Sequence, residues 1–246
     1  KQINEACHTT TLVCPVRESI SARRSTPNST FTIAFAGSVT APDELDGLQR
    51  ALDRCGWRIN NQDVCLRLFG RHFRINADSK RNIHFGGFLE TTDEVVAEIS
   101  KCDLCFLPSP FSESRRKLSE YSFPTKLTTY LASGVPVLAH APSWSAVARF
   151  ASKGVAETSQ QRFHSCAFGS IVTDPNSLSL IPAISAFAER GNLYEEAVSR
   201  TRDAANSEFS VERCQQLVAE HFATSRVRGK PHHASSPESP ATEILS

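Results

Sequence analysis

Lys126 is the residue of this sequence whose type and place best suit chemistry. It lies in FPTKLTTYLASGVPVLAHAP, Phe123 to Pro142, where a polar start leads into a helix-like stretch, a Gly-x-Pro turn and an apolar strand. Pro124 or Thr125 is expected to begin the helix, which places Lys126 in its first turn. A cation there opposes the helix dipole by about 0.3–1 kcal/mol. A bound anion such as a diphosphate would offset that cost, and the alternative is a lysine that extends into solvent.

Gly37 and Ser38 form a second candidate site, directly after the apolar run FTIAFA. A glycine at the carboxyl end of a strand lets a ligand approach the backbone closely. The amide groups that follow it into a helix can bind a phosphate. The alternative is an ordinary turn between a strand and a helix.

The polar stretch SESRRKLSEYS, 112–122, is the third region of interest. We expect it to be a long loop at the carboxyl edge of a sheet, and such loops often carry function. Its basic run, Arg115 to Lys117, has the composition of a solvated face. Glu120 is the better candidate, as a carboxylate that binds hydroxyl groups.

Other chemistries lack their motifs. Cys102 and Cys105 have CxxC spacing, but no second pair exists for zinc, and the pair lies between a helix end and an apolar strand. We therefore expect inert, apolar thiols, and the alternative is a redox pair. The histidines show no HxxxH or HExxH spacing, so no metal site is predicted. The motifs GxGxxG, GxxxxGK[ST] and GxSxG are absent.

Six apolar segments alternate with helix-like segments from Phe31 onward, with little period-2 alternation. This order predicts an α/β fold, a doubly wound, Rossmann-like parallel sheet covered on both faces, with further helices at its C-terminal end. Ligands bind at the carboxyl ends of the strands in such sheets. The predicted strands are 31–39, 63–70, 82–88, 103–109, 135–142 and 168–174. The predicted helices are 41–56, 91–102, 123–134, 143–154, 175–191, 192–209 and 210–222.

The composition of the 246 residues limits the class of protein. The net charge is +1, from 27 basic and 26 acidic residues, which does not favour nucleic-acid binding. No apolar run approaches the ~20 residues of a membrane span. The eight cysteines are scattered, which is typical of a reducing, cytoplasmic compartment.

The chain divides into one predicted domain and two flanking segments. Residues 31–222 form the domain. The chain opens on a lysine and contains no methionine, so 1–30 is expected to be the end of a preceding domain or a connection to it. The Ser-, Pro-, Arg- and His-rich residues 223–246 are expected to be a disordered tail.

The order of these segments resembles the C-terminal, donor-binding domain of GT-B glycosyltransferases, in the large retaining group 1 family that includes polysaccharide-biosynthesis enzymes. The resemblance covers about 31–222. Its most specific part is Phe123 to Pro142, which is similar to the family pattern P-x-K-L-x-x-Y-x-x-x-G-x-P-V.

The resemblance implies a donor site for a nucleotide diphosphate sugar, in a cleft that faces an N-terminal acceptor domain. It implies transfer of the sugar to a glycan or lipid-linked acceptor, and peripheral membrane association through the N-terminal domain. No metal or other cofactor is expected, because the sequence has no Asp-x-Asp motif and cations with a helix N-terminus can stabilise the diphosphate. This chain alone would be inactive. The implied donor-binding residues are Gly37 and Ser38 at the diphosphate, Phe88 near the base, and Glu120, Pro124, Thr125, Lys126 and Thr129 at the sugar, diphosphate and ribose.

Two departures from the family pattern leave an alternative open. Family members carry two glutamates eight positions apart, where this chain has Tyr121 and Thr129. They also carry an arginine and a lysine after the Gly-Ser turn, where this chain has no base. Lys126 would then supply the positive charge, and further candidates for the diphosphate are Arg71, Arg115 and Arg116. The alternative is a degenerate regulatory or interaction domain without catalysis.

Overall fold

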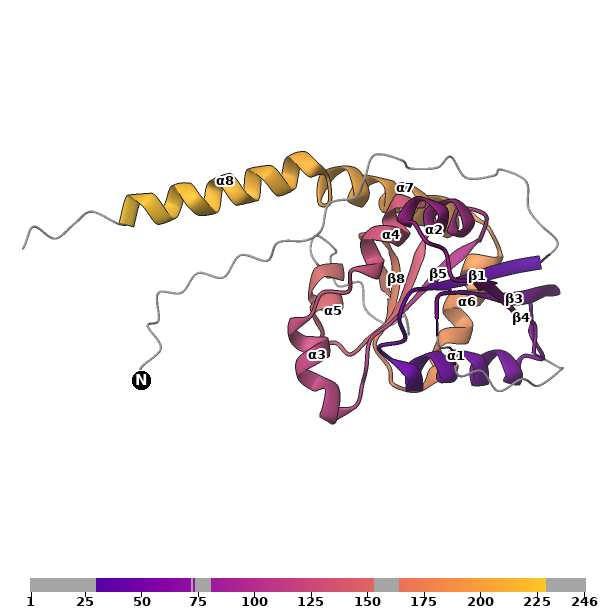
Figure 1. Ribbon diagram of the computed structural model, residues 1–246. Coiled ribbons are helices and arrows are strands. Elements are labelled where there is room, and N and C mark those ends of the chain that lie inside the picture. The colour runs from indigo at the N-terminus through magenta and orange to yellow at the C-terminus, as the bar shows by residue number, and fades with distance from the viewer. Residues whose placement is uncertain (1–29, 72, 74–80, 153–163, 229–246) are drawn as a thin grey trace, which may run out of the picture.

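A computed structural model describes residues 30–71, 73, 81–152 and 164–228, and these form an α/β domain around one mainly parallel sheet (Figure 1). Six parallel strands lie in the order β4-β3-β1-β5-β6-β8, the doubly wound order expected from the sequence. All six are the predicted strands. Their bounds are β1 Thr30–Ala36, β3 Gln62–Phe69, β4 Ile83–Gly87, β5 Leu104–Pro108, β6 Val137–His140 and β8 Gly169–Val172.

Two short antiparallel strands were not predicted. β2 (Arg58–Ile59) pairs with β3, and β7 (His164–Cys166) pairs with β8 at the other edge of the sheet. Asn60 and Asn61 connect β2 to β3 with positive φ angles of 51° and 61°, as a tight two-residue hairpin requires. Strands of two and three residues are too short to show a hydrophobic period in the sequence.

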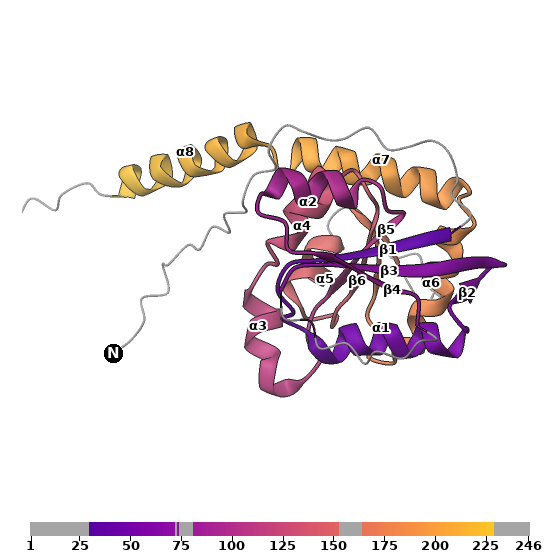
Figure 2. The same ribbon diagram turned by 45° about the vertical axis from the view of Figure 1, so that its right-hand side comes forward.

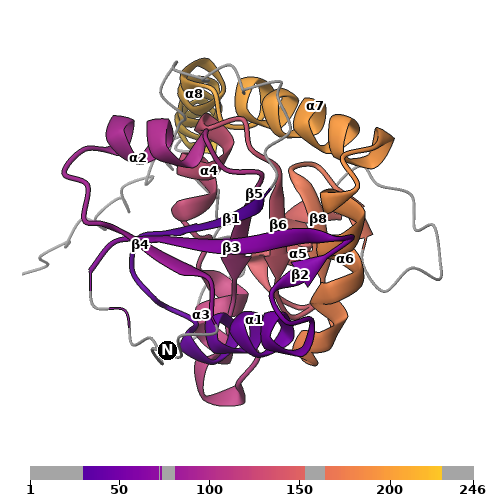
Figure 3. The same cartoon turned by 90° about the vertical axis from the view of Figure 1, so that its right-hand side faces the viewer.

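Helices cover both faces of the sheet (Figure 3). Phe31, Ile33 and Phe35 of β1 pack in the hydrophobic cluster of one face, with α1 and α6. Ala34 and Ala36 pack in the cluster of the other face, with α2, α4 and α5. α7 contributes residues to both clusters. Successive residues of β1 therefore point to opposite faces of the sheet, and both faces are buried. This explains why the sequence shows continuous apolar runs. The helix bounds are α1 Pro42–Arg54, α2 Thr92–Ile99, α4 Lys126–Ala132, α5 Ala146–Ala151, α6 Leu180–Ala188 and α7 Asn192–Ser207.

The stretch 112–122 is helical, so its prediction as a long loop is wrong. It forms a 3₁₀ turn, η1 (Glu113–Arg115), and then α3 (Arg116–Tyr121). Ser119 in α3 is buried, and its hydroxyl donates to the Pro110 carbonyl at 2.6 Å and lies 3.1 Å from the Ser109 hydroxyl. These hydrogen bonds fix one helical turn, and they depend on the folded position of the loop after β5.

The last helix, α8 (Val211–Arg228), runs past the predicted end of the domain at Phe222. The disordered tail predicted for 223–246 is therefore wrong for residues 223–228. No glycine or proline occurs between Phe222 and Gly229, so nothing in the backbone chemistry ends the helix earlier. Figures 1 and 2 show α8 extending away from the sheet. Segments 1–29 and 229–246 lie outside the described residues.

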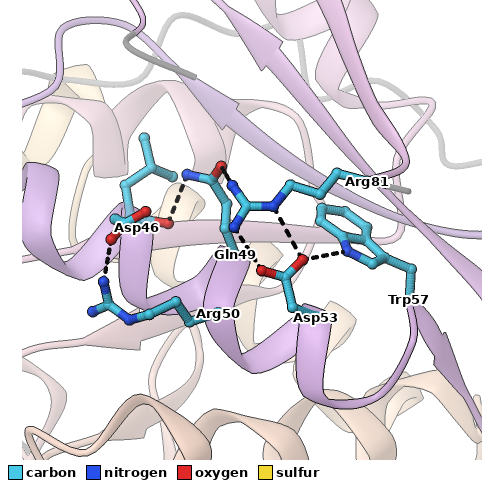
Figure 4. Close-up of polar contacts among 7 residues, drawn as sticks. Asp46, Gln49, Arg50, Asp53, Trp57 and Arg81 are labelled. Carbon is cyan, nitrogen blue, oxygen red and sulfur yellow. Dashed lines mark hydrogen bonds and ion pairs between the residues drawn. The ribbon is translucent and has the colours of Figure 1, made fainter. Parts of the chain in front are cut away.

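A polar network ties the start of β4 to α1 (Figure 4). The Arg81 guanidinium donates to both carboxylate oxygens of Asp53, at 3.1 and 2.6 Å, and to Gln49 Oε1 at 3.2 Å. Trp57 Nε1 donates to Asp53 Oδ1 at 2.9 Å. Burial alone would raise the pKa of Asp53, but the bonds from Arg81 and Trp57 outweigh it and lower that pKa. The network therefore connects the chain at the amino end of edge strand β4 to α1.

Within the described residues, no helix is long and apolar enough to cross a membrane.

Candidate functional site

A cavity of about 640 Å³ opens at the carboxyl edge of the sheet. Three segments line it: the turn after β1, the loop after β4 with the start of α2, and the first turns of α4. The strand order reverses between β1 and β5. These two strands pair only at Ile33–Leu104 and Ala34–Cys105, so they diverge toward this edge. Doubly wound sheets bind their ligands at this switch point. The lining residues are 36–38, 88–93, 95, 96, 125, 126, 128–130 and 132.

Six of the predicted donor-site residues line this cavity, and two do not. The six are Gly37, Ser38, Phe88, Thr125, Lys126 and Thr129. Glu120 and Pro124 are not among the lining residues. The Glu120 carboxylate lies 3.6 Å from Arg116 Nε, and its carbonyl accepts from Arg149. The Glu120 carboxylate therefore pairs within α3, and only its main-chain carbonyl connects α3 to α5.

None of the three further arginine candidates lines the cavity. The Arg71 guanidinium stacks on the Phe88 ring at 3.8 Å, so it touches the rim only through Phe88. Arg115 donates to the Thr40 carbonyl at 2.9 Å. Arg116 lies 3.5 Å from Glu113, and its guanidinium is 4.9 Å from the Trp144 ring centre. Of the residues that the structure describes, Lys126 is the only base that lines the cavity.

Gly37 makes room for the lysine. Its φ is 90°, a conformation that favours glycine, and its N–H donates to the Phe69 carbonyl at 2.8 Å. A Cβ placed on Gly37 would lie 3.3 Å from Lys126 Cε. The turn after β1 and the lysine stem are therefore in close contact, as a shared anion site would require.

Lys126 is the first residue of α4 and is half-buried. Its ammonium lies 5.7 Å from the centre of the Phe35 ring, and burial lowers its pKa. Among the described residues, no carboxylate lies within ion-pair distance of this ammonium. The cavity thus contains a partly desolvated cation that lacks a protein counter-ion.

The amides at the start of α4 are less available than the sequence predicts. Leu127 N–H donates to the Pro124 carbonyl at 3.1 Å, and Thr128 N–H donates to the Thr125 carbonyl at 3.2 Å. Thr128 Oγ1 also donates to the Thr125 carbonyl, at 2.7 Å. With these groups engaged in a helix of seven residues, the positive charge of the site comes chiefly from the ammonium.

Tyr130 joins α4 to the end of β1. Its ring is fully buried, its hydroxyl accepts from Ala36 N–H at 3.0 Å, and it lies 3.4 Å from the Ala36 carbonyl, to which it can donate. β1 has no ladder pairing with β5 at Ala36, so the phenol replaces the missing strand neighbour. Sequence reasoning did not select Tyr130, although it is the tyrosine of the family pattern.

Two acidic side chains from the opposite wall, Glu90 and Asp93, also line the cavity and were not predicted. They belong to the capping region of α2, where Thr91 Oγ1 accepts from Glu94 N–H at 3.2 Å and Glu94 Oε2 accepts from Thr91 N–H at 3.3 Å. The cavity is therefore polar on both sides, with a cation on α4 and carboxylates at α2.

The two cysteines of the CxxC pair are buried, which supports the expected apolar, unreactive thiols. Cys102 and Cys105 are buried, and burial raises the pKa of the Cys102 thiol to about 12 and that of Cys105 well above its usual value. A thiolate, the reactive form, is thus strongly disfavoured at both positions. Neither residue lines the cavity.

The fold is that of the GT-B type domains found in glycosyltransferases. Three solved structures share the fold: WaaG, a glycosyltransferase involved in lipopolysaccharide biosynthesis (TM-score 0.54, 14% identity), Anabaena Alr3699/HepE in complex with UDP (0.51, 17%), and the catalytic domain of the cholesterol-alpha-glucosyltransferase from Helicobacter pylori (0.50, 18%). They align with 89%, 80% and 72% of this chain, which spans 56%, 49% and 98% of their respective lengths.

The sequence profile of "Glycosyl transferases group 1" matches residues 30–160, more than half of the chain. The chain therefore belongs to the group 1 glycosyltransferase family. No curated protein matches the sequence. The chain covers about half of the length of the WaaG and HepE structures.

Proposed function

We propose that this chain is the donor-binding half of a glycosyltransferase. It binds a nucleotide diphosphate sugar and, paired with an N-terminal acceptor domain, transfers the sugar to a glycan or lipid-linked acceptor. The carrying observation is the Lys126 ammonium, which has no carboxylate partner among the described residues and lies beside the Gly37 turn in the cavity. The UDP complex of HepE, which has the same fold, supports a nucleotide diphosphate as the ligand.

In this proposal the chain acts on the leaving group. The Lys126 ammonium and the backbone at Gly37 and Ser38 bind the diphosphate and stabilise the charge that develops as the sugar departs. Because the ammonium is partly desolvated, its attraction for a phosphate oxygen is stronger than in water. The Thr125 and Thr129 hydroxyl groups face the same cavity and can bind phosphate or sugar oxygens. This arrangement demands no metal ion, and acceptor-side groups come from the other domain.

Calorimetry with UDP, GDP and ADP tests the proposal. The chain is expected to bind at least one of them. Lys126→Ala should weaken that binding about tenfold or more, because it removes a charged hydrogen bond worth about 1.5–3 kcal/mol. Lys117→Ala, which removes an exposed lysine of α3, is the matched control and should bind normally. Unchanged affinity in Lys126→Ala would refute the assigned role of the lysine.

A second candidate is a degenerate domain that regulates or contacts a partner without catalysis. The lining itself favours this candidate: it holds one base, two carboxylates from Glu90 and Asp93, and an uncharged threonine at 129. Carboxylates in the lining repel a diphosphate. A thermal-shift panel of nucleotide diphosphates separates the two candidates. A shift supports the donor site, whereas no shift with any of them supports the degenerate domain.

A further inference from the structure

Phe88 exposes an aromatic ring at the cavity. The ring is 51% exposed, and among the described residues that line the cavity the one other aromatic side chain, Tyr130, is fully buried. An exposed ring contributes little to the hydrophobic core, because a ring stabilises a fold by being removed from water. It does offer a flat apolar surface on which a nucleotide base can stack. A ligand whose diphosphate lies at Lys126 can therefore place its base on Phe88.

The Arg71 guanidinium lies 3.8 Å from the centre of this ring. At so short a distance the flat guanidinium lies against the ring, and its N–H groups, which are in its own plane, stay free to donate. Within the described part of the chain, Arg71 has neither a hydrogen-bond acceptor nor an ion-pair partner. The side chain is exposed, so a ligand at Phe88 can reach its N–H groups.

Backbone contacts between glycines hold Arg71 and Phe88 next to the cavity. Gly70 N–H donates to the Gly87 carbonyl at 2.9 Å, so Arg71 and Phe88 follow two hydrogen-bonded residues at the ends of neighbouring strands. Gly70 has a φ angle of 146°, and a Cβ placed on it would lie 2.9 Å from the Gly37 carbonyl oxygen. The chain that leaves β3 therefore touches the turn that lines the cavity. This contact keeps Arg71 at the rim without making it a lining residue.

We propose that Arg71 selects nucleotide sugars whose base carries a carbonyl group at its outer edge, uracil or guanine, over cytosine and adenine, which carry an amino group there. This inference rests on the proposed function, since it places the base of the nucleotide on Phe88. Because Arg71 contacts the ring from outside the lining, its N–H groups meet the outer edge of a base stacked there. A guanidinium can only donate hydrogen bonds, so it pairs with uracil O4 or guanine O6 but leaves an amino group without an acceptor.

Glu90 is the competing group, because it lines the same wall two residues after Phe88. A carboxylate can only accept hydrogen bonds, so it would favour the amino groups of cytosine and adenine. Arg71 is the stronger choice because it already contacts the ring. Glu90 belongs to the capping region of α2, where its N–H donates to Glu94 Oε2 at 3.0 Å. The two residues thus predict opposite orders of affinity.

Calorimetry of the full 246-residue chain with UDP, CDP, GDP and ADP tests this inference. UDP should bind more tightly than CDP, and GDP more tightly than ADP, by about fivefold or more in each pair. Arg71→Ala should remove this preference by weakening UDP and GDP binding, with little change for CDP and ADP. Arg71→Lys retains the charge but loses the planar array of N–H groups, so it should keep only part of the preference.

Arg58→Ala is the matched control. It removes an exposed arginine of β2 that pairs with Asp63 at 3.2 Å, at the amino end of β3, and it should retain the preference of the unaltered chain. Circular dichroism checks that each variant is folded.

Three results would overturn the inference and leave the proposed donor site standing. They are equal affinity within each pair of nucleotides, tighter binding of CDP and ADP, and an equal loss for all four nucleotides in Arg71→Ala, which would assign Arg71 to the diphosphate. Failure of all four nucleotides to bind the unaltered chain would instead overturn the proposed function, and this inference with it.

Discussion

Replacing Tyr130 by phenylalanine removes one oxygen atom from a buried position between α4 and β1. The Ala36 N–H then loses its acceptor at 3.0 Å, and no ladder bond from β5 can replace it. A buried donor left unsatisfied costs about 1–3 kcal/mol of folding free energy. The ring itself still fills its place in the core, so the variant should remain folded.

The consequence for the site is larger than the stability loss alone predicts. The Tyr130 hydroxyl fixes the end of β1 one residue before Gly37, and Tyr130 lies one helical turn after Lys126. Without it, the relative position of the Gly37 turn and the ammonium is less well defined. A hydrogen bond from the Lys126 ammonium to a phosphate is worth about 1.5–3 kcal/mol, and we expect the variant to lose part of it. The affinity for the best-binding nucleotide diphosphate should therefore fall by about threefold to tenfold.

Tyr194→Phe is the matched control. Tyr194 is also fully packed in the core, and its hydroxyl donates to the Asp103 carbonyl at 3.3 Å, near the amino end of β5 and far from the cavity. Urea denaturation should show a loss of stability in both variants, and calorimetry should show a loss of affinity only in Tyr130→Phe. Hydrogen exchange of the Ala36 amide should speed up only in Tyr130→Phe. Normal nucleotide affinity in a destabilised Tyr130→Phe would refute the positioning argument.

Three further predictions concern charge and backbone. Burial lowers the pKa of Lys126 below its usual value of 10.5. Because the lysine loses its charge as pH rises through that lowered pKa, a calorimetric pH series should show nucleotide diphosphate affinity falling. In Lys126→Arg the affinity should not change over the same pH range. Arg190 pairs with buried Asp103 at 3.0 Å. Urea denaturation of Arg190→Ala should therefore show a free energy of unfolding lower by about 3–5 kcal/mol, because the Asp103 charge stays buried without its partner. The double variant with Asp103→Asn should recover part of that free energy. Gly37→Ala should lower the free energy of unfolding by about 1–2 kcal/mol, because the φ angle at this position is 90°. It should also weaken nucleotide binding. Unchanged stability would contradict this geometry.

Much of the fold is predictable from local chemistry. Pro42 and the acidic first turn placed α1 correctly, and Thr91 with Glu94 forms a complete capping box at α2. The six parallel strands follow from continuous apolar runs between helices. The hairpin strand β2 and the edge strand β7 were missed because two or three residues carry no readable period.

The candidate site was predictable only in part. Gly37 and Lys126 stood out because a glycine after a strand and a cation in a first helical turn are locally unusual. Glu90 and Asp93 did not, since acidic residues at the start of a helix are ordinary. Arg71, Arg115 and Arg116 were candidates by charge alone. Arg71 contacts the Phe88 ring and Arg115 the Thr40 carbonyl, partners that are distant along the chain and that charge does not reveal. Arg116 lies near its own helical neighbours Glu113 and Glu120.

The sequence by itself determined the alternation of strands and helices, the burial of the sheet on both faces, and a lone lysine at the start of a helix, because these depend on neighbours within a few residues. The tertiary structure decided which of those features meet. Ala36 and Tyr130 are 94 residues apart, yet one hydroxyl joins them and brings Lys126 against Gly37. It also turned Ser119 inward and Leu118 and Tyr121 outward, because buried hydrogen bonds from the loop after β5 outweighed the hydrophobic preference of so short a helix.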